Sequence, residues 1–441
     1  MPLSHLKRIN YKLLLVLMAF ILIPALYSTT RVYFLGNLPD PWAFSIAAQV
    51  AWLNVIYEVI NEGLMLPLAF ILGQVMSKPT EYGKRITTAL FFIVLIYLIM
   101  TFFVIVLAPS FIVFMQQSSK LVSTTIIYIR LESVGIFISC VFNFCSLILV
   151  LKNNQAALLR LLLMKAIFTV IFDGIFVSQL SISLKLGING VAYTNIFVNS
   201  LLCLISFNYL RKEGLNINNL TLQNNVWMKE WVKIGAKSGF ASFVRNTAFI
   251  VMVLQLVNQV QQDDTFWLTN QFIWSWLLLP VLALGLLIKQ DAACSHEFTL
   301  QRLQAYMLLT MGIISTWLFT MPMWSDFLSN IMGITDVTPV YELAVLMLVF
   351  YMVFAFNNVI DSYFYGIGRT DLMLYQSLMV NIIYYGCAYY VYHIGWFIPS
   401  IDGIAILFGL GIVFDALITF ILYWYVIKTV ELELSTSSIP N

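Results

Sequence analysis

Long apolar runs separated by short polar segments cover almost the whole chain. A helix needs about 20 predominantly apolar residues to cross the hydrocarbon core of a bilayer, and a sliding hydropathy window of about 19 residues locates such segments. This pattern predicts twelve transmembrane helices, at residues 13–35, 46–75, 86–108, 125–151, 156–180, 187–210, 231–259, 266–288, 303–325, 339–367, 372–394 and 401–428. We therefore expect an all-α polytopic membrane protein.

The composition agrees with a protein that is embedded in a lipid bilayer. Of the 441 residues, 61% are hydrophobic and 10% are charged, whereas soluble domains carry about 25% charged residues. The formal net charge of +2 gives no reason to expect a nucleic-acid partner. We expect the lipid bilayer as the partner of the chain, and we expect a monomer.

The sequence offers no pattern for enzymatic chemistry or for a bound cofactor. The five cysteines and three histidines lack metal-ligand spacing, which argues against a metal site and against disulfides. No histidine is arranged with a serine, cysteine or aspartate as a nucleophile and base, and no G-x-x-x-x-G-K-[ST] loop occurs. We therefore expect no enzyme and no cofactor.

The distribution of lysine and arginine predicts the orientation. Seventeen of the 23 Lys and Arg residues fall at the termini and in the loops on their side of the membrane. Because cytoplasmic loops are rich in Lys and Arg, both termini are expected in the cytoplasm. We read the basic N-terminus and first apolar run as a retained span, and we expect a bacterial cytoplasmic (inner) membrane protein.

Two sequence matches at the same offset indicate an internal duplication. Leu66-Pro67 matches Leu279-Pro280, and residues 188–192 (INGVA) match residues 401–405 (IDGIA), both 213 positions apart. Repeats of this kind place a substrate site at their interface. We predict two pseudo-symmetric six-helix bundles around a central cleft, at residues 1–212 and 231–441, joined by a hydrophilic cytoplasmic linker at 213–230.

A polar stripe interrupts the apolar span at 46–75. Glu58 and Glu62 lie midway along it, beside Asn54 and Asn61. A carboxylate at that depth costs roughly 2.5–3.5 kcal/mol on insertion scales. Two carboxylates four residues apart disfavour each other's ionisation, so that one can hold a proton, as a proton-coupled carrier requires. The alternative is a structural polar contact with a neighbouring helix.

A second polar cluster is predicted around an aspartate in the fifth span. Its members are Asp173, Thr169, Asn143, and Thr194 or Asn195, from the fourth to sixth spans. We interpret the cluster as an ion or proton site. The alternative is a set of hydrogen bonds between helices.

Several short motifs occur in order along the chain. They are Thr169-x-x-x-Asp173, residues 186–195 (LGINGVAYTN), residues 233–239 (KIGAKSG) and residues 365–370 (YGIGRT). In the same order, they resemble the motifs N-x-x-x-D, L-G-V-x-G-A-A-x-A-T, K-x-G-x-P-x-G and R-G-L-G-x-T of the multidrug and toxin extrusion (MATE) family, which belongs to the multidrug/oligosaccharidyl-lipid/polysaccharide (MOP) transporter superfamily. The resemblance covers most of the chain and implies a secondary transporter.

The chain departs from the family pattern at two charged positions. Residues 31–38 (RVYFLGNL) resemble D-T-x-F-x-G-x-L, with Arg31 where many members have an aspartate that helps bind the coupling cation. Arg245 stands where some members carry a glutamate. Because a guanidinium keeps its proton and needs an anionic partner when buried, we predict that a fixed arginine replaces a mobile cation in each half. The alternative for Arg31 is that it snorkels to the outer headgroups.

The expected pairs are Arg31–Asp173 and Arg245–Asp361, the second beside Asn357 and Asn358. Both join residues that lie in different predicted spans.

These features predict an antiporter for multidrug efflux, which exports amphipathic organic solutes or drugs by alternating access. Cation coupling is expected, with protons favoured over sodium. The alternative is a flippase or exporter of an anionic or lipid-linked molecule on the same fold, with a cationic cavity formed by Arg31, Arg130, Lys165 and Arg245. Basic side chains that face the cavity without acidic partners would favour this alternative.

Overall fold

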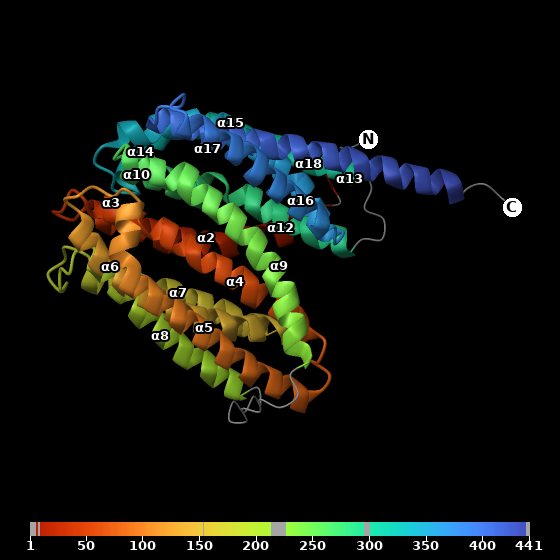
Figure 1. Ribbon diagram of the computed structural model, residues 1–441, viewed down its shortest axis with the longest axis horizontal. Helices are drawn as coiled ribbons and strands as arrows, with labels where there is room; N and C mark the ends of the chain where they lie inside the picture. Colours follow the sequence, from red (N-terminus) through yellow and green to blue (C-terminus); the bar gives the residue numbers. More distant parts are fainter. Residues whose placement is uncertain (1–5, 8, 153, 213–225, 295–299, 438–441) are drawn as a thin grey trace. The chain divides into compact units, whose positions relative to one another are not determined.

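The computed structural model describes residues 6–437 except 8, 153, 213–225 and 295–299. Most of the predicted linker at 213–230 therefore lies outside the described residues. Those that are described form helices and connecting turns, with no strand among them (Figure 1).

Helices coincide with all twelve predicted spans. The first six spans correspond to α2 (Tyr11–Gly36), α3 and α4 (Ala43–Ala48 and Val50–Gly73), α5 (Pro79–Phe114), α6 (Val122–Leu151), α7 (Gln155–Phe176) and α8 (Asn189–Lys212). The next three correspond to α9 and α10 (Val226–Phe249 and Gln255–Gln259), α11 and α12 (Asp263–Phe272 and Leu279–Cys294), and α13 and α14 (Leu300–Thr320 and Trp324–Asn330). The last three correspond to α15 (Val337–Gly366), α16 and α17 (Thr370–Met379 and Tyr385–His393) and α18 (Ile401–Ser437).

The length and apolarity of these helices make the chain a multi-pass membrane protein. Within the described residues, nine helices are long and apolar enough to cross a membrane, and a bent pair formed by Asp263–Leu277 and Leu279–Ala292 would make a tenth span. The pair bends by 52° just before Pro280. Proline favours such a bend because it lacks a backbone N–H and clashes with the preceding turn.

The described helices pack as two compact units. The first comprises Leu26–Trp267 with Ile331–Thr335, and the second comprises Met1–Ala25, Leu268–Asn330 and Asp336–Asn441. The predicted division into bundles at 1–212 and 231–441 rests on the internal repeat and stays a prediction.

In the first unit, α4 packs closely against α9, and α6 against α5 and α8. The close approach of α4 and α9 depends on glycines. A Cβ atom on Gly235 would overlap the carbonyl oxygen of Gly63, and one on Gly239 would lie 3.4 Å from the Gly63 Cα. Small residues of this kind let transmembrane helices approach at backbone distance.

In the second unit, α15 packs against α12 and α18. A buried cluster there joins the start of α2 to α12, α13 and α15 through Leu14, Leu284, Tyr306 and Val359.

Candidate functional site

A polar cavity of about 210 Å³ lies among α2, α4, α6, α7 and α8 of the first unit. Its lining is unusually polar for the interior of an apolar bundle. The polar lining residues are Tyr27, Arg31, Asn54, Glu132, Ser139, Lys165, Thr169, Asn195 and Asn199. Three of these side chains are ionisable at neutral pH: Arg31, Glu132 and Lys165.

The structure confirms the predicted pair between Arg31 and Asp173. Arg31 Nε donates to Asp173 Oδ2 at 2.9 Å, and Arg31 Nη2 donates to Oδ1 at 3.3 Å. The side chains are 18% and 1% exposed, so Arg31 does not reach out to headgroups. Two bonds from one guanidinium fix its plane, and Asp173 thereby holds Arg31 at the cavity wall.

Glu132 is a cavity carboxylate that the sequence analysis missed. It lies on α6, is 5% exposed, and accepts a hydrogen bond at Oε1 from Asn195 Nδ2 at 2.6 Å. Its Oε2 is buried and has no partner among the described residues. The available signal was an acidic residue inside the predicted span at 125–151, the same signal that identified Glu58 and Glu62.

Lys165 contributes a second cation to the cavity. Its Nζ lies 5.7 Å from the ring centroid of Phe142, and a cation over an aromatic face is attracted electrostatically. In the part of the chain that the structure describes, no carboxylate forms an ion pair with Lys165. Together with Asp173, the site therefore contains two cations and two carboxylates.

The remaining members of the predicted Asp173 cluster divide into two groups. Thr169 is 3% exposed and lines the cavity, as does Asn195. Thr194 is fully buried next to Asn195, with its hydroxyl unpartnered among the described residues. Asn143 is exposed, lies four residues after Ser139 on α6 and is not among the residues that line the cavity; its membership of the cluster stays a prediction.

Glu58 and Glu62 form a second charged cluster with Arg245. Arg245 Nη2 lies 2.5 Å from Glu62 Oε1 and 3.2 Å from Glu58 Oε1. The predicted pair Arg245–Asp361 is therefore wrong. Because α9 packs along α4, Arg245 meets the carboxylates of α4, which the sequence analysis had assigned to a separate site.

Asp361 lies instead in an amide-rich cluster of the second unit. It accepts hydrogen bonds from Asn357 Nδ2 at 3.1 Å and from Thr419 Oγ1 at 3.2 Å. Asn357 Nδ2 also donates to Asp415 at 2.8 Å, and Gln376 Nε2 donates to the same carboxylate at 2.7 Å. The sequence analysis did not single out Asp415 or Gln376.

Asn358, which was predicted beside Asp361, is directed elsewhere. Its Nδ2 donates to the backbone carbonyl of Val281 on α12 at 3.1 Å. Its role is therefore to join α15 to α12.

Comparisons with known proteins find similarity at the level of structure. No family model matches the chain, and no curated protein matches it. A multidrug resistance MATE family transporter of the MOP superfamily in an inward-facing conformation superposes with a TM-score of 0.79 at 13% identity, over 95% of this chain and 99% of that chain. The VcmN MATE transporter of Vibrio cholerae gives a TM-score of 0.68 at 14% identity, over 97% of this chain and 98% of that chain.

A third similar structure is a MOP superfamily transporter from Pyrococcus furiosus, described as having a binding pocket of reverse polarity that suggests a different function. It gives a TM-score of 0.64 at 15% identity, over 98% of this chain and 97% of that chain. In each case the similarity spans nearly the full length of both chains. The chain therefore has the fold of the MATE transporters of the MOP superfamily.

Proposed function

We propose that this chain is a secondary active transporter that exports amphipathic organic solutes by alternating access. The polar cavity, which is lined by Arg31, Glu132 and Lys165 and supported by Asp173 behind Arg31, carries the proposal. Ionisable residues inside a membrane bundle are costly, and they mark ion and substrate pathways. The fold supports the proposal, because similar structures are described as inward-facing and outward-facing conformations of multidrug transporters.

We further propose that protons drive transport and that Glu132 carries the coupling proton. Arg31 stays charged at any physiological pH, and the carboxylate of Asp173 balances its charge. Glu132 has an unpartnered buried oxygen, Oε2. A proton on Oε2 would remove a buried charge from the wall of the cavity.

Sodium fits this cavity less well than a proton. Arg31 and Lys165 both line it, and like charges repel strongly where the dielectric constant is low. A proton bound covalently to a carboxylate does not need the several oxygen ligands that a metal ion requires.

The Arg245 cluster is a second candidate proton site. Two carboxylates share one guanidinium there, which leaves one negative charge without a paired cation. Glu58 and Glu62 lie on α4, the helix that also contributes Asn54 to the cavity lining. In this proposal the cluster and the cavity carboxylates share the binding of the coupling protons.

The alternative cargo is an anionic or lipid-linked molecule, and Lys165 is the observation in its favour. Three of the four basic residues that would form a cationic cavity have other partners. Arg31 and Arg245 pair with carboxylates, and Arg130 Nε donates to the carbonyl oxygen of Ile105 at 3.0 Å. An anionic cargo would be favoured by several basic side chains that face the cavity without an acidic partner, and of these four only Lys165 is in that position within the described ranges. We therefore favour export of an amphipathic solute.

Transport into proteoliposomes with imposed ion gradients tests the proposal. With an acidic vesicle interior, a fluorescent cationic dye should accumulate, and Glu132→Gln should abolish the dependence on the gradient. Glu342→Gln is the matched control, because Glu342 is exposed on α15 and forms no ion pair within the described residues. Movement driven by sodium alone, or movement of anionic lipids without dye movement, would contradict the proposal.

A further inference from the structure

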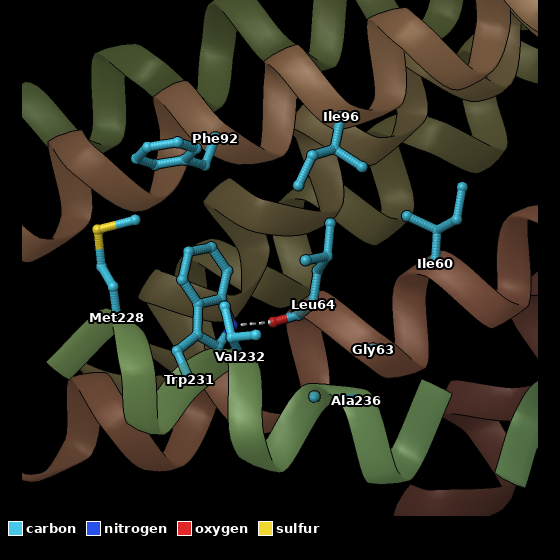
Figure 2. Close-up of a pocket in the computed structure, with 10 residues that line it drawn as sticks. Ile60, Gly63, Leu64, Phe92, Ile96, Met228, Trp231, Val232 and Ala236 are labelled. Carbon is cyan, nitrogen blue, oxygen red and sulfur yellow. Dashed lines mark hydrogen bonds between the residues drawn. The ribbon is translucent and has the colours of Figure 1, made fainter. Parts of the chain in front are cut away.

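An apolar pocket of about 410 Å³ lies between α4, α5 and α9, apart from the polar cavity. Its volume falls within the usual range of small-molecule sites, roughly 300–1,000 Å³. The lining comes from Ile60, Gly63 and Leu64 of α4, Phe92 and Ile96 of α5, and five residues of α9 that include Trp231 and Ala236 (Figure 2).

Trp231 forms one wall of this pocket and presents no free donor to it. Its Nε1 donates to the carbonyl oxygen of Leu64 at 2.9 Å, as the dashed line in Figure 2 shows. The ring packs against Trp227, with centroids 5.8 Å apart and planes inclined by 19°. With this hydrogen bond made, the pocket accepts an apolar occupant.

Basic residues border the pocket at the end where α5 and α9 begin. Arg85 lies over the ring of Trp227, 5.5 Å from its centroid. Lys84 on α5 and Lys229 and Lys233 on α9 are exposed, and in the described part of the chain none of these three lysines forms an ion pair.

The depth of the pocket relative to these cations matches a phospholipid. Phe92 and Ile96 lie about 10 and 16 Å beyond Arg85 along α5, at roughly 1.5 Å per residue. Lysine and arginine at the ends of transmembrane helices reach the headgroup level. The α5 wall of the pocket therefore lies at the level of acyl chains. On α9, Lys229 and Lys233 alternate with the lining residues Met228 and Val232, so the end of the pocket where α9 begins lies at the level of the headgroups.

We propose that this pocket binds one acyl chain of an anionic phospholipid from the leaflet on the predicted cytoplasmic side, with the headgroup held by Lys84, Lys229 and Lys233. Charge complementarity and the apolar lining together select this occupant. The site is independent of the transport proposal, since it shares no residue with the polar cavity.

Native mass spectrometry of the purified protein with added phosphatidylglycerol or phosphatidylcholine tests the proposal. Wild type should retain one more phosphatidylglycerol than phosphatidylcholine. Ala236→Trp, which fills the pocket from an exposed position, should lose that lipid, whereas Ala19→Trp, on an exposed position of α2, should retain it.

The charge variant tests the headgroup contact without altering the pocket. Lys229→Gln with Lys233→Gln should lower the preference for phosphatidylglycerol by about fivefold for each lysine removed. Lys7→Gln with Lys12→Gln, a pair exposed near the N-terminus, should leave it unchanged. Equal binding of the two lipids to wild type, or an unchanged preference in the Lys229/Lys233 variant, would overturn the proposal. Either result would leave gradient-driven dye transport as a separate question.

Discussion

Neutralising either partner of the Arg31–Asp173 pair should strongly destabilise the protein, and neutralising both should cost less than the sum of the two single losses. Asp173→Asn keeps the shape of the side chain but leaves Arg31, which is 18% exposed, without its carboxylate. Arg31→Gln leaves the carboxylate of Asp173, which is 1% exposed, without its cation. Removing one partner of a buried ion pair costs about 3–5 kcal/mol, because the remaining charge is uncompensated.

The double variant Arg31→Gln/Asp173→Asn leaves no buried charge at this position. Its loss of unfolding free energy should therefore fall short of the sum of the single losses by about 2–3 kcal/mol, near the upper end of measured couplings between contacting residues. The assay is reversible unfolding in mixed micelles at increasing SDS fraction, followed by circular dichroism, for wild type and the three variants.

Arg369 and Asp371 supply the control cycle. They form a similar two-bond pair, at 3.0 and 3.1 Å, but their side chains are 44% and 51% exposed. Exposed ion pairs contribute little because water screens them, so this cycle should show no measurable coupling. Additive losses for Arg31 and Asp173, within about 0.5 kcal/mol, would refute the interpretation of a fixed buried pair.

Three further predictions concern the helix contacts and the orientation. Gly235→Ala should abolish stable folding in a thermal-shift measurement, because the added Cβ would overlap the Gly63 carbonyl oxygen. Gly174→Ala, whose Cβ meets open space, should raise or preserve the melting temperature. Equal behaviour of the two variants would contradict this packing. Arg245→Gln should lower the free energy of unfolding, because it leaves Glu58 and Glu62 without their cation. Adding Glu58→Gln and Glu62→Gln should restore much of that stability. A further loss of stability in the triple variant would argue against the cluster. Cysteines placed at the two termini should react with an impermeant maleimide only in inverted membrane vesicles, and labelling in intact cells would contradict the predicted orientation.

The helical elements were predictable because the bilayer imposes a simple length and polarity rule on them. The Arg31–Asp173 pair was predictable for a related reason: charged residues are so rare in the spans that a deep arginine has few possible partners. Motif order along the chain also indicated the fold that the structural comparisons support.

The partners of Arg245 could not be predicted in the same way. Asp361, Glu58 and Glu62 are all intramembrane carboxylates, and only the packing of α9 along α4 selects between them. Hydropathy gives the existence of each helix but not its neighbours. The repeat in the sequence favoured a partner within the same half, and the structure places the contact between segments about 185 residues apart.

Glu132 was missed because it stands alone on its helix, without the i, i+4 partner that drew attention to Glu58 and Glu62. Its importance comes from the cavity, where α2, α6, α7 and α8 converge. Asn143 is the converse case. It has a suitable residue type on α6, but it is not among the residues that line the cavity, and hydropathy cannot resolve a difference of a single helical turn.

Proton movement coupled to substrate provides the decisive measurement. With a pH-sensitive dye trapped inside proteoliposomes and no imposed gradient, addition of a transported cationic dye should move protons in the opposite direction in wild type and in Glu342→Gln. Glu132→Gln should bind the dye but move no protons. Substrate-dependent proton movement at the wild-type rate in Glu132→Gln would show that the polar cavity is not where the proton is carried.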